Sequence, residues 1–260
     1  MAPRKKLIVG NWKMNLSVHE ASLYLHKISE MIPVRRDVDV VLAPTLLALQ
    51  PLSLQVNRRQ FKLAVQNFYW RDHGAFTGEV SAAQLHGIVD YAIVGHSERR
   101  HVFNETEKDI RNKVQAAVRN NIRPILCIGE TTSDRSYGET DDIIRDQLTS
   151  GLANLTSDDL EMLVIAYEPV WAIGTGNNAL PSDVTDAIKV VRNEVKHLFG
   201  AKAAEVVRVL YGGSVTASNA ADYLSVKGVD GFLIGGASLS SHDFTDIVTK
   251  AHSSVAVTKA

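Results

Sequence analysis

Residues 91–128 read YAIVGHSERRHVFNETEKDIRNKVQAAVRNNIRPILCI, and this stretch contains the pattern that decides the fold. Two short apolar runs, Tyr91–Val94 and Ile122–Ile128, enclose the segment Glu107–Arg119, whose apolar residues recur at the spacing of one helix face. Neither run alternates apolar with polar residues, which is typical of strands covered on both faces in a parallel sheet. The stretch therefore predicts a right-handed strand–helix–strand unit.

The same alternation extends along the whole chain. Eight apolar runs predict strands, at Leu7–Gly10, Val38–Ala43, Lys62–Val65, Tyr91–Val94, Ile122–Ile128, Met162–Ala166, Val206–Leu210 and Gly231–Ile234. Amphipathic segments between them predict helices, with start signals at Ser17–Glu20 and Pro181–Asp183. A closed barrel and an open doubly wound sheet both match this pattern. The count of eight and the length of 260 residues favour a single (β/α)8 barrel domain, with residues 1–6 as a short N-terminal arm and 252–260 as a C-terminal tail.

The composition argues against several classes of protein. Hydrophobic residues make up 45% of the chain, which is ample for a packed core, and a net charge of −1 argues against a dedicated nucleic-acid binder. No apolar run is long enough to predict a membrane span. The single cysteine, Cys127, leaves no internal disulfide framework or Cys-rich zinc site and favours a reducing cytoplasm. His96 and His101 have the wrong spacing for a zinc pair on one helix face, so no metal is expected.

Chemically capable residues follow the predicted strands directly. Because the carboxyl ends of parallel strands meet at one edge of a sheet, we expect these residues to form one site. Two of the turns contain paired glycines before a predicted helix, and such turns are suited to binding phosphate through backbone N–H groups. The residues at these positions are Asn11 and Lys13, His96 to Glu98, Glu168, Gly212 to Ser214, and Gly235 and Gly236.

Three of these residues have properties that suit catalysis. Glu168 ends an apolar strand and precedes Pro169, so the sequence predicts a shielded carboxylate in extended backbone, as a general base requires. The glycine-containing segment 169–177 beside it predicts a lid. His96 begins a predicted helix, whose positive end favours a neutral imidazole, and Lys13 is suited to neutralising developing negative charge.

Two other features leave alternatives open. The letters of Gly174–Ala179 match a dinucleotide-binding pattern, which would indicate a nicotinamide-dependent oxidoreductase. They stand several residues beyond the predicted strand, however, whereas such a motif forms the strand-to-helix turn itself. The aromatic residues Phe68–Trp70 and Phe76 lie in one long connection, where they could form an interface or pack onto this chain's own barrel.

Five motifs in order resemble the triosephosphate isomerase family. They are NWKMN at 11–15, GHSERR at 95–100, AYEPVWAIGTG at 166–176, YGGSV at 211–215 and GFLIGGASL at 231–239. The similarity extends from about Leu7 to Ile247. The resemblance implies a (β/α)8 barrel that interconverts dihydroxyacetone phosphate and D-glyceraldehyde 3-phosphate through an enediolate. It also implies that no cofactor is needed, and a place in glycolysis and gluconeogenesis.

The resemblance also implies residue roles. Glu168 would be the base, neutral His96 the electrophile, Lys13 the group that stabilises the enediolate, and Asn11 a hydrogen-bonding partner of a substrate oxygen. The segment 169–177 would close over the substrate. Glu98 and Ser97 would support these residues from behind the site. The phosphate would be bound by Gly174, Ser214, Gly235 and Gly236.

The family further implies a homodimer. The loop 66–79 would reach into the neighbouring subunit and bring Thr77 near the partner's Asn11 and Lys13. The far end of the lid reads Asn177-Asn178-Ala179, where relatives often have Lys-Thr-Ala. Two further readings would use the same barrel without this activity, namely a non-catalytic binding protein and another sugar-phosphate enzyme such as an epimerase.

Overall fold

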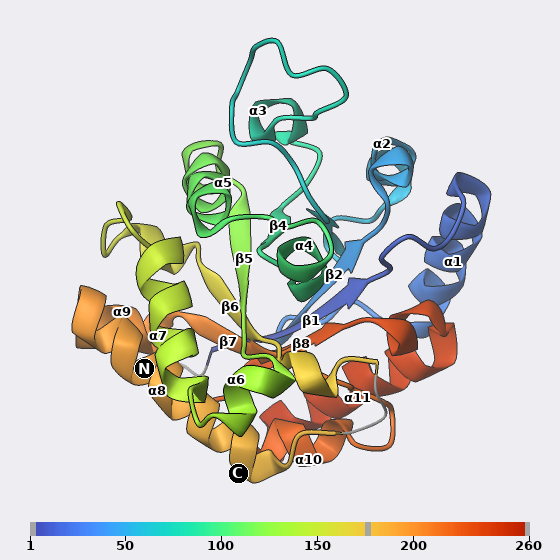
Figure 1. Ribbon diagram of the computed structural model, residues 1–260. Coiled ribbons are helices and arrows are strands. Elements are labelled where there is room, and N and C mark those ends of the chain that lie inside the picture. The colour runs from blue at the N-terminus through green and yellow to red at the C-terminus, as the bar shows by residue number, and fades with distance from the viewer. Residues whose placement is uncertain (1–3, 175–177, 258–260) are drawn as a thin grey trace.

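The computed structural model describes residues 4–174 and 178–257. Its centre is a closed barrel of eight parallel strands in chain order, with β8 paired to β1 through Leu7 and Gly231 (Figure 1). This closure confirms the predicted barrel and excludes the open sheet. The strands are β1 (Lys6–Asn11), β2 (Val38–Ala43), β3 (Lys62–Val65), β4 (Tyr91–Val94), β5 (Arg123–Ile128), β6 (Val164–Tyr167), β7 (Arg208–Tyr211) and β8 (Gly231–Ile234).

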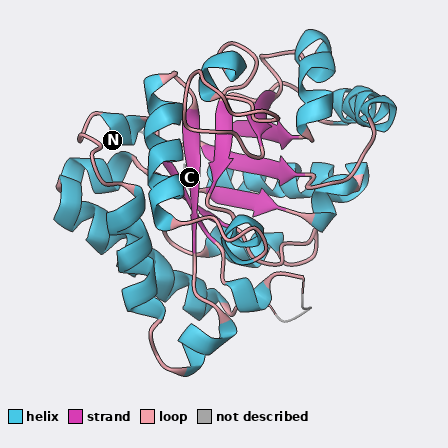
Figure 2. Cartoon of the chain, turned by 45° about the horizontal axis from the view of Figure 1, so that its top comes forward, coloured by secondary structure: helices cyan, strands magenta, loops and turns pink. Residues whose placement is uncertain are grey.

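Helices surround the barrel on its outer side (Figure 2). Within residues 4–174 and 178–257, no helix is long and apolar enough to cross a membrane. The α-helices are α1 (Val18–Met31), α2 (Leu46–Gln55), α3 (Ala82–Leu85), α4 (Ser97–His101), α5 (Glu107–Arg119), α6 (Thr132–Ser136), α7 (Thr140–Gly151), α8 (Pro181–Phe199), α9 (Ala201–Val206), α10 (Ala220–Ser225) and α11 (Ser241–Val257). The part of the chain that the structure describes also contains three short 3-10 helices, η1 (Asp159–Glu161), η2 (Val170–Ala172) and η3 (Gly236–Leu239).

The strands are apolar throughout because both of their faces are buried. In β1, Leu7 and Val9 point into the barrel interior, whereas Ile8 packs in the layer between the sheet and the helices. The helices begin where side chains satisfy their free N–H groups. At α1, Ser17 and Glu20 form the predicted capping box, with the Glu20 N–H donating to the Ser17 hydroxyl at 3.3 Å.

Some predicted boundaries differ from the structure. β7 begins at Arg208 rather than Val206, because the apolar residue Val206 closes helix α9 instead of opening the strand. The expected C-terminal tail is wrong for residues 252–257, which are the last turns of α11. There Val255 is buried and the imidazole of His252 contacts the carboxylate of Asp37 at 2.6 Å. At the other terminus Lys6 already belongs to β1.

Candidate active site

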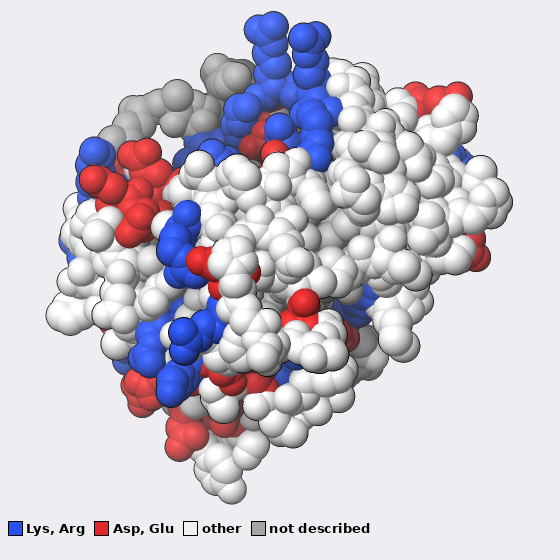
Figure 3. All heavy atoms as spheres, turned by 90° about the horizontal axis from the view of Figure 1, so that it is seen from above, with Lys and Arg blue, Asp and Glu red and all other residues white. Residues whose placement is uncertain are grey.

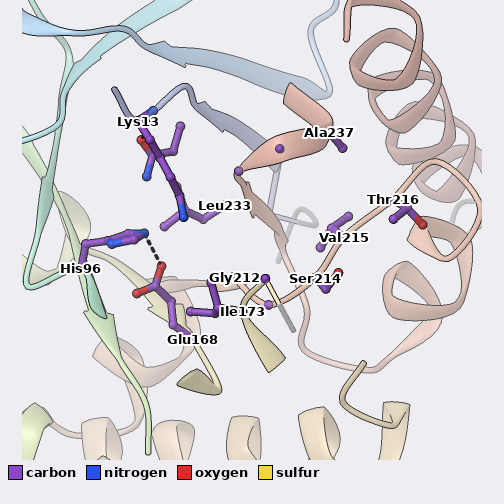
Figure 4. A pocket seen from close by; sticks show the side chains of 15 residues that line it. Lys13, His96, Glu168, Ile173, Gly212, Ser214, Val215, Thr216, Leu233 and Ala237 are labelled. Carbon is purple, nitrogen blue, oxygen red and sulfur yellow. Dashed lines mark hydrogen bonds and ion pairs between the residues drawn. The ribbon is translucent and has the colours of Figure 1, made fainter. Parts of the chain in front are cut away.

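One pocket of about 260 Å³ lies at the carboxyl ends of the strands. In Figure 4, Lys13, His96 and Glu168 lie on one side of it, and Ser214 and Ala237 on the other. The fold therefore brings together strand-end residues that lie far apart in the chain, from Asn11 to Gly236. Ser97 and Glu98 are not among the residues that line the pocket. The sequence-predicted residues that do line the pocket are Asn11, Lys13, His96, Glu168, Gly174, Gly212, Gly213, Ser214, Gly235 and Gly236.

Glu168 and His96 form a buried pair in this pocket. The carboxylate Oε1 of Glu168 lies 3.2 Å from Nε2 of His96, and its Oε2 accepts a hydrogen bond of 3.0 Å from the backbone N–H of Ser97. Only 2% of Glu168 and 6% of His96 is exposed. A carboxylate held beside an imidazole and screened from water can exchange protons with a ligand in the pocket.

The contacts of His96 define its tautomer. The ring begins helix α4, where its Nδ1 accepts a hydrogen bond of 3.2 Å from the backbone N–H of Glu98. A nitrogen that accepts a hydrogen bond carries no proton, so the neutral ring has its proton on Nε2, which faces Glu168 and the pocket. The imidazole is therefore set to donate a hydrogen bond to an oxygen of a bound ligand.

The backbone of Gly212, at the end of β7, makes room for Glu168. A Cβ atom added to Gly212 would lie 2.8 Å from Cγ of Glu168, closer than side-chain carbons normally approach. The φ angle of Gly212 is not left-handed, so the backbone conformation itself would accept a residue with a side chain. The close approach to Glu168 is what opposes such a residue. The first of the paired-glycine turns thus shapes the space that the Glu168 side chain occupies.

We expect Gly212→Ala to lower kcat by about 10- to 100-fold, because it would displace Glu168, the general base that the sequence predicts, and a displacement of about 1 Å can cost that much. The thermal unfolding midpoint should also fall, because the methyl group meets Cγ of a buried side chain whose two oxygens are held by His96 and Ser97. Steady-state kinetics and calorimetry check both points. An unchanged kcat would show that Glu168 tolerates the added methyl group.

Lys13 occupies an unusual backbone conformation. Its φ is +52°, a value that residues other than glycine rarely adopt. Its ammonium group donates a hydrogen bond of 2.6 Å to Glu98, and its backbone N–H donates to the side-chain oxygen of Asn11 at 3.1 Å. A Cβ added to Gly235 would lie 3.3 Å from Cε of Lys13, so this second glycine turn lets the lysine stem pass.

The glycine turns form the end of the pocket that suits an anion. Gly235 directly precedes η3, and Ser214 follows the paired glycines after β7. Backbone N–H groups at such turns and helix starts attract phosphate. Lys13 adds a positive charge to the same pocket.

Glu130 is a buried residue that the sequence analysis missed. It lies just beyond β5 and is fully buried, and it accepts hydrogen bonds from the Trp171 indole at 2.7 Å and the Tyr167 hydroxyl at 3.2 Å. Burial raises the pKa of Glu130, and the hydrogen bond from Trp171 opposes this shift. Its position after a strand, like that of Glu168, was the available signal. Glu130 anchors the first part of the predicted lid, whose residues 175–177 lie outside the described residues.

The structure also bears on the other predicted sites. The dinucleotide-type pattern begins well beyond its strand, because β6 ends at Tyr167 and η2 lies between that strand and Gly174; residues 175–177 of the pattern lie outside the described residues. Across the described ranges, 4–174 and 178–257, no group of three or more His, Cys, Asp or Glu side chains is arranged to hold a metal ion.

The fold is that of a (β/α)8-barrel protein, and its polar pocket lies at the end of the barrel where such proteins carry out their chemistry. The family model described as triosephosphate isomerase matches residues 6–251. This protein belongs to the triosephosphate isomerase family.

Curated relatives of that name cover almost the whole chain. The relative from Caldanaerobacter subterraneus subsp. tengcongensis is 41% identical over 248 residues, which are 94% of this chain and 99% of the relative. The relative from Clostridium beijerinckii is 42% identical over 248 residues, which are again 94% of this chain and 99% of the relative. The relative from Streptococcus mutans serotype c is 43% identical over 242 residues, which are 93% of this chain and 96% of the relative.

Proposed function

We propose that the protein is an aldose–ketose isomerase that interconverts dihydroxyacetone phosphate and D-glyceraldehyde 3-phosphate. The observation that carries this proposal is the buried contact of 3.2 Å between Glu168 and His96 in a pocket that also contains Lys13 and the glycine turns. Membership of the family and the names of its curated relatives agree with it. The lone buried Cys127 favours a reducing compartment, so we propose that the enzyme acts in the cytoplasm, in glycolysis and gluconeogenesis.

The reaction moves one proton between adjacent carbons. Glu168 takes the proton from C2 of glyceraldehyde 3-phosphate, and the electron pair of that C–H bond forms the C1–C2 double bond while the carbonyl oxygen gains negative charge. His96 donates from Nε2 to this oxygen and passes a proton between the two oxygens of the enediol. Protonated Glu168 then returns its proton to C1, which gives dihydroxyacetone phosphate.

The remaining residues act on charge. Lys13 stabilises the developing enediolate, and Asn11 donates its amide hydrogen bond to a substrate oxygen. The phosphate is bound by backbone N–H groups of Gly174, Ser214, Gly235 and Gly236. Closure of the lid 169–177 over the phosphate then excludes water and suppresses elimination of phosphate from the enediolate.

A coupled assay tests this function. The protein should convert glyceraldehyde 3-phosphate in the presence of EDTA and without added cofactor, with product formation followed by a dihydroxyacetone phosphate-specific reporter reaction. A non-catalytic barrel protein would give no turnover. A nicotinamide-dependent oxidoreductase would require the coenzyme in stoichiometric amounts, and an epimerase would convert other sugar phosphates instead.

We propose that the protein works as a homodimer through loop 66–79. A second cavity of about 280 Å³ lies at the base of this loop and is lined by Met14, Leu46 and Gly78, among others. Met14 is 92% exposed and adjoins Lys13. Figure 3 views the side that carries α3, and charged side chains are sparse over the middle of it. These features suit a second copy whose own loop fills the cavity and brings Thr77 near the partner's Asn11 and Lys13.

A charge substitution tests the dimer. We expect Met14→Glu to shift the protein toward the monomer, because an exposed carboxylate costs little in one subunit but is desolvated between two. Sedimentation equilibrium should give a dimer mass for the unaltered protein and a smaller mass for the variant at equal concentration. Leu54→Glu is the matched control, since Leu54 is 80% exposed on α2 but does not line the cavity. A monomer mass for the unaltered protein at micromolar concentration would contradict the proposal.

A further inference from the structure

The side-chain amide of Gln66 joins the ends of three neighbouring strands. Gln66 directly follows β3, and its Nε2 donates one hydrogen bond of 2.8 Å to the backbone oxygen of Lys13 and another of 2.8 Å to that of Ala43. Ala43 is the last residue of β2, and Lys13 lies two residues beyond β1. Both hydrogens of the amide group are therefore used, and both bonds hold backbone atoms next to the pocket.

The Lys13 backbone needs such support. Its left-handed φ of +52° is unfavourable for a residue with a side chain, and a conformation of this kind persists only when its surroundings hold it. Asn11 binds the N–H side of the residue and Gln66 binds its carbonyl side. The conformation determines the direction of the lysine stem, which passes Gly235 to reach the pocket.

The two hydrogen bonds of Gln66 require a side chain that can donate two hydrogens. Both partners of Gln66 are carbonyl oxygens, which only accept hydrogen bonds. A methionine of similar length would leave these two acceptors without this donor and would relax the restraint on Lys13. The ends of β2 and β3, and not only the end of β1, thus hold the Lys13 backbone from which the side chain projects.

We propose that Gln66 is a positioning residue for catalysis, which acts by holding Lys13 in the conformation that aims its ammonium group into the pocket. This inference rests on the proposed role of Lys13 in stabilising the enediolate. Gln66 does not line that pocket, so its effect on the reaction passes through Lys13.

Gln66→Met tests the inference directly. We expect kcat/KM to fall by about 10-fold, because the variant loses the hydrogen bond that holds the Lys13 carbonyl and also the one that ties the side chain at position 66 to the end of β2. Gln60→Met is the matched control, because the Gln60 amide likewise donates to two backbone oxygens, those of Ser29 and Ile32, away from the pocket. The control should lose similar thermal stability and keep its kcat/KM. Equal kinetic losses in the two variants would overturn the inference.

Two further measurements separate positioning from other effects. In a double-mutant cycle that measures binding of glycerol 3-phosphate, Gln66→Met should weaken binding in the unaltered protein but not in a Lys13→Met background. A loss of the same size in both backgrounds would overturn the inference. Gln66 also lines the cavity proposed for dimer contacts, so activity is measured over a range of protein concentrations. Activity that recovers at high concentration would assign the effect to assembly and overturn the positioning role.

The inference and the proposed function fail in different ways. If Lys13→Met alone has normal kcat/KM, the role proposed for Lys13 is wrong. If Lys13→Met is impaired and Gln66→Met is not, the role of Lys13 stands and the positioning role of Gln66 is wrong.

Discussion

Glu168→Asp is expected to lower kcat by about 10²- to 10³-fold, because the shorter side chain draws the carboxylate back from the reacting carbon by more than 1 Å. Glu168→Gln removes the carboxylate that we propose as the base and should lower kcat by up to about 10⁴-fold. Both substitutions leave the glycine turns and Lys13 in place. Binding of glycerol 3-phosphate, which lacks the reacting carbonyl, should therefore stay close to that of the unaltered protein.

Rapid-quench kinetics and isothermal titration calorimetry measure the two quantities separately. Glu161→Asp is the control, since Glu161 lies in η1 at an exposed position outside the pocket. A Glu168→Gln enzyme with undiminished kcat would remove Glu168 from the role of base. Lost analogue binding together with a lower melting temperature would instead indicate that the substitution disrupted the pocket.

Lys13→Met is expected to lower kcat by about 10²- to 10³-fold, the cost typical of removing one group that stabilises transition-state charge. The methionine retains most of the apolar stem beside Gly235 and removes the ammonium group. Binding of glycerol 3-phosphate should weaken as well, because the pocket loses a positive charge. Steady-state kinetics and calorimetry give both values.

Glu98 provides the control for this experiment. Lys13 and Glu98 form an ion pair of 2.6 Å, so removing the lysine alone leaves an unpaired carboxylate near the pocket. The double variant Lys13→Met/Glu98→Gln removes that negative charge too. If the substrate needs the lysine cation, the double variant stays as slow as the single one. Recovery of activity would mean that Lys13 serves only to neutralise Glu98.

Much of the barrel could be predicted because its strands are buried on both faces. Burial of this kind leaves continuous apolar runs, and four of the strands, β2, β3, β4 and β8, have the predicted bounds. Helix α5 also has its predicted bounds, since both its capping box and its apolar face are local signals. The predicted strands at Met162 and Val206 begin two residues too early. Apolar residues there end η1 and α9, and composition alone does not distinguish the end of a helix from the start of a strand.

The members of the candidate site could be predicted for a different reason. In a parallel barrel all strand ends meet at one rim, so the position of Glu168, His96 or Lys13 relative to its strand is enough to bring it to the pocket. Their orientations depend on contacts between distant segments. The hydrogen bonds of Glu130 to Trp171 and of Gln66 to Lys13 have no local pattern, and the three-dimensional arrangement alone reveals them.

Turnover in D₂O measures whether the isomerisation proceeds by proton transfer, the step that we propose for Glu168. A carboxylic acid that has taken up the substrate proton can exchange it with solvent before returning a hydrogen to C1. Proton NMR should therefore find dihydroxyacetone phosphate carrying one deuterium at C1 in at least part of the product formed from unlabelled glyceraldehyde 3-phosphate. Product that contains no deuterium at C1 at any stage of turnover would indicate a direct hydride shift and contradict the proposed mechanism.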